Sequence, residues 1–172
     1  MVLEMIYFFD TFYFDNTGRT AVLGIEHWKD AEPVFELIDL KKDIKAYESG
    51  SFYKRELPCL VHALEKVELE PSKDILVVDG YVCLSDEGKF GLGGHLYHHL
   101  GRAFPVIGVA KNDFQELSNK EKVYRGQSKN PLYVTAIGLD SNKASSHIKS
   151  MHGSYRLPTI LKLVDQKSRK MV

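Results

Sequence analysis

The sequence has few cysteines, no excess of either charge and no long apolar run. Cys59 and Cys83 are the only cysteines among 172 residues, and they lack the spacing of metal ligands, so we expect both to be reduced packing residues. Lysine and arginine together number 23, as do aspartate and glutamate, which excludes a histone-like basic coat and counts against a nucleic-acid partner. A local groove of a few lysines is nevertheless enough to bind nucleic acid where metal ions contact the phosphate that is cleaved.

The sequence also lacks segments that would target, anchor or divide the chain. No apolar stretch approaches the ~20 residues that span a bilayer, and the first residues carry Glu4 rather than a basic region. We therefore expect a cytoplasmic protein without membrane contact. No repeat, low-complexity run or linker is visible, so residues 1–172 are expected to form a single domain, and we expect that domain to be a monomer.

Three β-strand patterns open the chain. Residues 6–14 ("IYFFDTFYF") alternate between two faces, and "RTAVLGIEHW" and "PVFELIDL" give a second and a third strand. The tight "DNTG" connection favours an antiparallel meander. The first helix is predicted from Tyr53, with Pro58 tolerable only in its first turn and with apolar residues at helical spacing: Leu57, Leu60, Val61, Leu64 and Val67.

Strands and helices then alternate. The run "ILVV" before Asp79 and the run "FPVIGVA" before Lys111 are typical of buried strands, and a glycine-rich loop that leads into a helix separates them. "KVYRGQ" and "PLYVTAIGL" give one or two further strands, and two helices follow, with Ser141 and Ser154 as candidate N-caps. This order predicts an α/β fold of the ribonuclease H-like class, with a mixed central sheet of three antiparallel and then parallel strands, and with helices on both faces.

Two aspartates should meet in such a fold. The first strand is then central, and the strand that ends at Asp79 lies parallel beside it, so Asp10 projects next to the end of that strand. Asp10 shares a face with Phe8 and Phe12 and has no lysine or arginine within several residues, so its burial is costly unless something pairs with it. Asp79 either caps the turn at Gly80 or holds a ligand at the carboxyl end of a strand, where open α/β sheets bind ligands.

Three further charged residues have two interpretations each. Glu56 either complements the dipole at a helix start or binds a metal ion, and Asp165 either pairs with Arg169 on the last helix or joins the same site. Lys111 is either a surface lysine at a strand end or a cation that meets a phosphate. Three or four carboxylates in one cleft provide the hard oxygen ligands that Mg²⁺ and Mn²⁺ prefer, so these residues jointly suggest a metal site.

Six stretches, taken in order, carry a resemblance to a known family: "FFDTFYF", "SGSFYKRELP", "ILVVDG", "PVIGVAK", "NPLYVTAIG" and "RLPTILKLVD". Together they resemble the endonuclease V family, whose enzymes nick nucleic acid near deoxyinosine or inosine, and the resemblance covers nearly the whole chain. It implies four metal-binding carboxylates: Asp10, Glu56, Asp79 and Asp165. It also implies that Lys111 is an active-site lysine and that three residues contact the nucleic acid: Tyr13, Gly80 and Tyr47. Tyr47 would stack where the base has left the helix.

The resemblance implies a Mg²⁺-dependent endonuclease, with Mn²⁺ able to substitute, that cleaves DNA or RNA on the 3′ side of inosine and leaves 3′-hydroxyl and 5′-phosphate ends. The chain departs from the family pattern in two places. It lacks a His-Pro-Arg run after the second aspartate, and the segment "KAYESGSF" keeps Tyr47 without the prolines that usually surround this tyrosine. Two alternatives therefore stand beside this function: a nuclease of the same architecture without inosine selectivity, and a catalytically weak nucleic-acid-binding protein.

Overall fold

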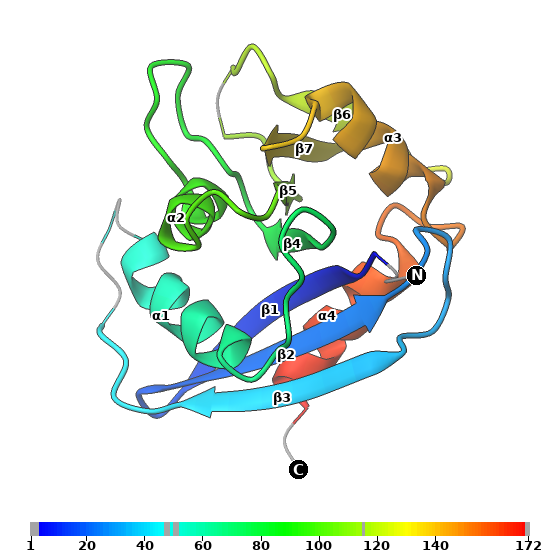
Figure 1. Ribbon diagram of the computed structural model, residues 1–172. Helices are drawn as coiled ribbons and strands as arrows, with labels where there is room; N and C mark the ends of the chain where they lie inside the picture. Colours follow the sequence, from blue (N-terminus) through cyan, green and yellow to red (C-terminus); the bar gives the residue numbers. More distant parts are fainter. Residues whose placement is uncertain (1–3, 47–48, 50–51, 115, 171–172) are drawn as a thin grey trace.

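The computed structural model describes residues 4–46, 49, 52–114 and 116–170, which form a seven-stranded sheet with four helices (Figure 1). No helix in this part of the chain is both long enough and apolar enough to cross a membrane. In chain order the elements are β1 (Ile6–Phe14), β2 (Thr17–Ile25), β3 (Phe35–Lys41), α1 (Tyr53–Leu64), β4 (Ile75–Asp79), α2 (Leu92–His99), β5 (Val106–Ala110), β6 (Glu121–Val123), β7 (Leu132–Ile137), α3 (Ser141–Ser150) and α4 (Thr159–Arg169).

The strand order is β3-β2-β1-β4-β5-β7-β6, so the first strand lies inside the sheet, as predicted. β1, β2 and β3 pair antiparallel, β4 lies parallel to β1, and β5 lies parallel to β4. These pairings confirm the predicted α/β fold with a mixed sheet. Beyond β5 the sheet turns antiparallel again, because β7 pairs antiparallel with β5, and β6 pairs antiparallel with β7.

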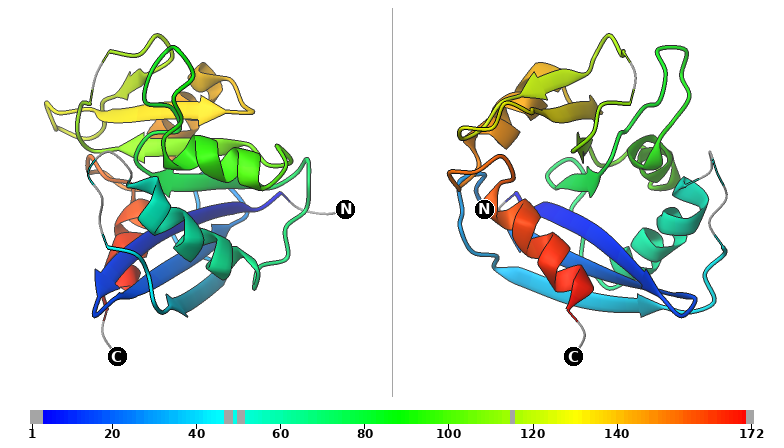
Figure 2. Two further views of the ribbon diagram at one scale, coloured as in Figure 1. Left: turned by 90° about the vertical axis from the view of Figure 1, so that its left-hand side faces the viewer. Right: turned by 180° about the vertical axis from the view of Figure 1, so that it is seen from behind.

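Helices cover both faces of the sheet, as predicted (Figure 2). On one face α1 and α2 pack against a core cluster that includes Tyr7 and Val106. On the other face α3 and α4 pack against a cluster that includes Phe8 and Ile107. Because successive residues of a strand point to opposite faces, each central strand supplies side chains to both clusters, which explains the unbroken apolar runs in the sequence.

β1 and β4 separate towards the carboxyl end of β4. Their parallel pairing ends at Phe8 and Val77, whereas β1 continues beside β2 as far as Phe14. β4 ends at Asp79, and Gly80 follows with φ +105°, a conformation that residues with a side chain rarely adopt. The separation opens the sheet at the ends of its central strands, which is where open α/β sheets bind ligands.

α1 begins at Tyr53, as predicted, but the place of Pro58 within it and the caps predicted for the last two helices differ from the structure. α1 begins early enough that Pro58 lies in its second turn, where it removes one backbone hydrogen bond. Asp140 rather than Ser141 caps α3, because Asp140 has an extended backbone and its carboxylate accepts a hydrogen bond from a first-turn amide. α4 begins directly after Pro158, so Ser154 belongs to the connection between the two helices instead of capping the second.

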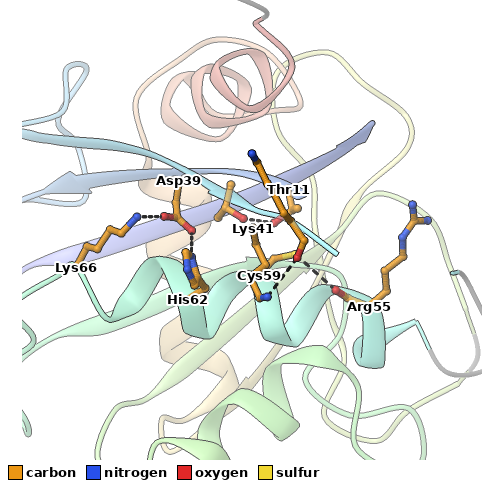
Figure 3. Close-up of polar contacts among 9 residues, drawn as sticks. Thr11, Asp39, Lys41, Arg55, Cys59, His62 and Lys66 are labelled. Atoms are coloured by element: carbon orange, nitrogen blue, oxygen red, sulfur yellow. Dashed lines mark hydrogen bonds and ion pairs between the residues drawn. The ribbon is translucent and has the colours of Figure 1, made fainter. Parts of the chain in front are cut away.

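A buried ionic cluster fixes α1 to the edge strand β3 (Figure 3). Asp39 of β3 is only 1% exposed; His62 Nδ1 lies 2.5 Å from one of its carboxylate oxygens, and Lys66 Nζ contacts the other. Breaking a buried pair leaves an uncompensated charge, so this cluster favours one placement of α1 on the sheet. α1 carries Glu56, and the anchor therefore bears on the geometry of the site described next.

Candidate active site

The alternation of side chains along three strands brings three of the predicted residues to one face of the sheet. Asp10, Asp79 and Lys111 each stand two positions after a core residue that faces α4, and Asp165 comes from α4 itself. These four side chains line one cleft of about 20 Å³, which is room for about one water molecule. The rest of its lining is apolar: Phe9, Val109, Leu157, Leu161 and Val164.

Asp10 and Asp165 share a hydrogen bond at this cleft. Burial, this hydrogen bond and the charge of Asp79 raise the pKa of Asp10 from 3.8 to about 7. Burial alone would also raise the pKa of Asp165, but the hydrogen bonds from Asp10 and Arg169 lower it below its ordinary value. Asp10 is therefore the protonated donor of this pair at mildly acidic pH, and Asp165 is the ionised acceptor.

Asp165 also forms the ion pair that the sequence offered as its alternative role. Arg169 Nε lies 3.0 Å from Asp165 Oδ1, one turn further along α4. Arg169 is mostly exposed, so solvent screens this pair and limits its contribution to about 1 kcal/mol or less. The two interpretations of Asp165 are thus compatible, because one carboxylate reaches both the cleft and the helix surface.

Glu56 lies in the first turn of α1 and is only 4% exposed. Burial raises its pKa well above the ordinary range, and the charges of Asp79 and Asp10 raise it further. A glutamate that only complemented the helix dipole could remain in solvent, where it would not meet this desolvation cost. Glu56 stands outside the set of side chains that line the small cleft, but the charges of both aspartates act on its carboxyl group.

Lys111 supplies positive charge to the cleft. Burial raises the pKa of Asp79, and the Lys111 ammonium opposes that rise. The same ammonium acts on Asp10 and Asp165, where it favours the ionised carboxylates. Lys111 follows β5 directly and is itself exposed, so its charge is accessible to an anionic ligand that enters the cleft.

Two arginines for which the sequence predicted no role bind backbone carbonyls near the cleft, and one of them binds that of Lys111. The Arg156 guanidinium donates to the carbonyl of Lys111 and, at 2.7 Å, to the carbonyl of Pro131. The Arg125 guanidinium donates to five carbonyls of residues 149–156, which comprise the end of α3 and part of its connection to α4. Their partners lie 24 to 45 residues away in the sequence, so no local pattern could have revealed them.

Tyr13 and Tyr47, two of the predicted nucleic-acid contacts, have different outcomes. The Arg55 guanidinium carbon lies 3.9 Å from the centroid of the Tyr13 ring, a cation–π contact beside Glu56. Burial, followed by the charge of Glu56, raises the pKa of Tyr13. Among the described residues, neither the Tyr13 hydroxyl nor Arg55 Nε has a hydrogen-bond partner, although both atoms are buried. Tyr47 lies outside the described residues.

A larger cavity of about 330 Å³ lies next to the cleft and shares Asp79 with it. The Tyr81 hydroxyl donates to the Asn112 carbonyl at 2.6 Å and accepts from the Phe114 amide at 3.1 Å, which fixes the loop after β5 against this cavity. Gly80 leaves its wall open, because no described atom lies within 4 Å of where a Cβ would stand. Four aromatic residues are among those that line the cavity, which suits a planar group: Phe52, Tyr53, Tyr81 and Phe114.

The donor atoms of the cleft suit Mg²⁺ or Mn²⁺. The raised pKa values of Asp10, Glu56 and Asp79 reflect burial and mutual repulsion that the nearby cations do not fully relieve. Within the described ranges, no three His, Cys, Asp or Glu side chains are already gathered into a metal centre. Mg²⁺ does not require such a cage, because it keeps several waters and uses one or two carboxylates together with substrate phosphates.

The sequence model of the endonuclease V family matches residues 3–166. An endonuclease V of Trichormus variabilis is 24% identical over 172 residues, which cover 88% of this chain and 76% of the relative. The structure of endonuclease V from Streptomyces avermitilis has a TM-score of 0.74 at 22% identity, and the match covers 97% of this chain and 80% of the S. avermitilis chain. A Ciona intestinalis endonuclease V, solved with a 23-mer DNA that contains an inosine followed by a ribo-adenosine, has a TM-score of 0.78 at 16% identity, with coverage of 97% and 84%. Because the family model matches nearly the whole chain, and related structures share its ribonuclease H-like fold, this chain belongs to the endonuclease V family.

Proposed function

We propose that this chain is a Mg²⁺-dependent endonuclease that hydrolyses a phosphodiester bond on the 3′ side of inosine or deoxyinosine, leaving 3′-hydroxyl and 5′-phosphate ends. The observation that carries the proposal is the convergence of Asp10, Asp79, Lys111 and Asp165 on one small cleft at the end of β4. Carboxylates suit a divalent cation, and a lysine beside them suits a phosphate. Membership of the endonuclease V family supports the class of reaction.

The side chains of the cleft have distinct roles in this proposal. A divalent cation bound there would lower the pKa of the attacking water and stabilise the departing 3′ oxygen. Asp10, Glu56 and Asp79 would hold it through their carboxylate oxygens, with Asp165 as a further donor. Asp10 would first release the proton that it shares with Asp165, because a nearby cation favours the ionised carboxylate. Lys111 Nζ would neutralise charge on the scissile phosphate.

The aromatic cavity beside Asp79 would hold the inosine base. Extrusion of a base from a stack costs a few kcal/mol, and stacking on aromatic side chains returns about 1–3 kcal/mol per base. Tyr53 and Phe114 line this cavity, and the open wall at Gly80 lets a base approach the backbone. Tyr47 would stack where the base has left, and Tyr13 remains a predicted contact with the nucleic acid.

A panel of labelled strands tests the proposal. The purified protein is incubated with Mg²⁺, Mn²⁺ or a chelator on DNA and RNA, single- and double-stranded, each with inosine or guanosine at the same position. We expect metal-dependent cleavage at the second phosphodiester 3′ to inosine, with a 5′-phosphate on the downstream product. Equal cleavage of guanosine strands would indicate a nuclease without inosine selectivity. Absence of metal-dependent cleavage on every strand would leave a nucleic-acid-binding protein and contradict the proposal.

A further inference from the structure

A basic hollow of about 450 Å³ lies beside the first turns of α1, between this helix and the segment that follows β3. Its walls carry four cations and one carboxylate: Lys41, Lys45, Lys54, Arg55 and Asp43. The remaining lining is apolar or aromatic: Ile44, Tyr53, Leu57 and Pro58. Lys41 and Arg55 come from the facing elements β3 and α1 (Figure 3). The lining of the hollow therefore combines an excess of positive charge with apolar side chains.

This positive charge is a local feature. The chain as a whole has 23 basic and 23 acidic side chains, whereas the hollow has four basic side chains against one acidic, a net charge of about +3. The amino-terminal turn of α1 adds the positive end of a helix dipole. Lys41 Nζ donates to the carbonyl of Lys42 at 3.2 Å, which uses one of its three protons. The electrostatics of this surface favour a polyanion.

The frame of the hollow is fixed by contacts on three sides. The Ile44 amide donates to the Asn16 carbonyl at 3.1 Å, which ties the segment after β3 to the turn between β1 and β2. The Asp39 cluster ties α1 to β3. The ring of Tyr53 stacks on His95 of α2, with 3.6 Å between the ring centroids. A ligand thus meets a hollow whose walls are already positioned, which limits the entropy cost of binding.

Tyr53 connects this hollow with the reaction site. It lines both the hollow and the cavity that contains Asp79 and Gly80. Arg55, from the wall of the hollow, directly precedes Glu56, whose pKa responds to the charge of Asp79. A nucleic-acid strand with one nucleotide in the cavity would therefore pass Tyr53 and continue along the hollow.

We propose that the basic hollow binds the phosphate backbone of the substrate strand, next to the nucleotide that the cavity holds, and that Lys41 and Lys45 contact its phosphates. This inference rests on the proposed function, since it takes the cavity as the site of the base. The ligand is a single strand of nucleic acid, whose phosphates meet the lysines and whose sugars and bases meet the apolar side chains of the lining. Binding there adds affinity that does not depend on which base occupies the cavity.

The salt dependence of binding tests this inference. Dissociation constants are measured between about 50 and 200 mM salt for an inosine-containing single strand and its guanosine counterpart, with every protein carrying Asp79→Asn so that no cleavage intervenes. Each phosphate contact to a single strand contributes about 0.7 to the slope of log K against log salt, so Lys41→Ala with Lys45→Ala should reduce the slope by about 1.4 on both strands. Lys45→Arg should keep the wild-type slope.

Lys149→Ala is the matched control, because Lys149 is an exposed lysine of α3, and α3 lies apart from α1 (Figure 1). It should leave the slope unchanged, and melting curves check that each variant is folded. A slope that the double variant shares with wild type overturns the inference. Cleavage by the protein with Asp79 intact is measured separately. If the double variant has the reduced slope but the protein with Asp79 intact cleaves no strand, the result contradicts the proposed function and retains the inference. If the protein with Asp79 intact cleaves but the double variant has an unaltered slope, the result retains the proposed function and contradicts the inference.

Discussion

At the residue scale, the charged side chains of the cleft show what a sequence pattern can and cannot resolve. The spacing of Asp165 and Arg169 indicated an ion pair, and the combination of Asp165 with the other carboxylates indicated a place in the site. The structure contains both the ion pair with Arg169 and the contact with Asp10. The rotation of α4 about its axis decides which of these partners the Asp165 carboxylate reaches, and a sequence pattern does not give that rotation. For Glu56 the position in a first turn was predictable, but its burial was not, because distant parts of the chain supply the covering atoms.

The first prediction concerns Asp165 and its neighbour on α4. Asp165→Asn removes a charge from the cleft and the ion pair with Arg169, whereas Arg169→Ala removes only the ion pair. A cation that binds only the folded protein stabilises it by about 2.7 kcal/mol at a hundredfold excess over Kd. We expect Asp165→Asn to shrink the rise in melting temperature caused by Mn²⁺, and Arg169→Ala to preserve that rise.

Thermal melts with and without Mn²⁺ measure both increments. Without metal, each variant should lose about 1 kcal/mol or less, the contribution of an exposed pair. If Asp165→Asn keeps the full Mn²⁺ increment, its carboxylate has no part in metal binding and serves the helix alone.

At the element scale, the strands were predictable and several junctions were not. Apolar β-branched runs indicated β4 and β5, and the hydrophobic spacing indicated α1 and α4. The cap predicted for α4 was wrong, because the Arg125 guanidinium binds carbonyls of the preceding connection, including those of Met151 and Gly153, and so holds Ser154 in a non-helical segment. The antiparallel return through β7 and β6 was equally hidden, since strand direction depends on tertiary pairing.

The second prediction concerns Arg156, which positions the loop after β5 through the carbonyl of Lys111. Arg156→Ala frees this backbone and should lower the single-turnover cleavage rate by roughly 10- to 100-fold, because a displacement of about 1 Å costs that much in a positioned site. The increment in melting temperature caused by Mn²⁺ should persist, since the carboxylates remain.

A double-mutant cycle separates positioning from general damage to the fold. If Arg156 acts through Lys111, then Arg156→Ala should have little further effect on cleavage in a Lys111→Ala protein. Fully multiplicative effects of the two changes on the rate would show that Arg156 acts by another route.

At the scale of the whole molecule, overall composition concealed a strong separation of charge. The balanced total of 23 basic and 23 acidic residues gave no sign that carboxylates would converge at one end of β4, or that four cations would line a hollow beside α1. The order of the strand patterns predicted that Asp10 and Asp79 would meet, but for a phosphate backbone the sequence could indicate only that a local groove would suffice. Strand order and helix placement convert dispersed charges into two neighbouring surfaces of opposite sign.

The third prediction concerns the pH dependence of stability without metal. The pKa of Asp10 rises from 3.8 to about 7 on folding, and the pKa values of Glu56 and Asp79 also rise. At pH values between the ordinary and the raised pKa of each group, the folded protein binds more protons than the unfolded chain. The free energy of unfolding therefore falls as pH rises from about 4 to above 7. Each unit of pKa difference corresponds to about 1.4 kcal/mol.

Urea unfolding at several pH values, with a chelator or with Mg²⁺, measures this loss. We expect the metal-free protein to be more stable near pH 5 than near pH 8, and Mg²⁺ to offset most of the difference by occupying the ionised cleft. A metal-free protein that gains stability over this range would contradict the assigned burial of these carboxylates. The depressed pKa of Asp165 acts in the opposite sense, but only in the acidic range below its ordinary value.

The most direct test of the central claim, that the carboxylate cleft performs metal-dependent phosphodiester hydrolysis, is single-turnover cleavage of an inosine-containing strand by Asp79→Asn. Asparagine keeps the shape of Asp79 and removes its charge, so the fold should persist while the rate in Mg²⁺ falls by at least about 10²-fold. Asp140→Asn is the matched control, because asparagine also caps α3 and Asp140 is exposed on another part of the surface. A folded Asp79→Asn protein that cleaves at a rate close to that of Asp140→Asn would contradict the account.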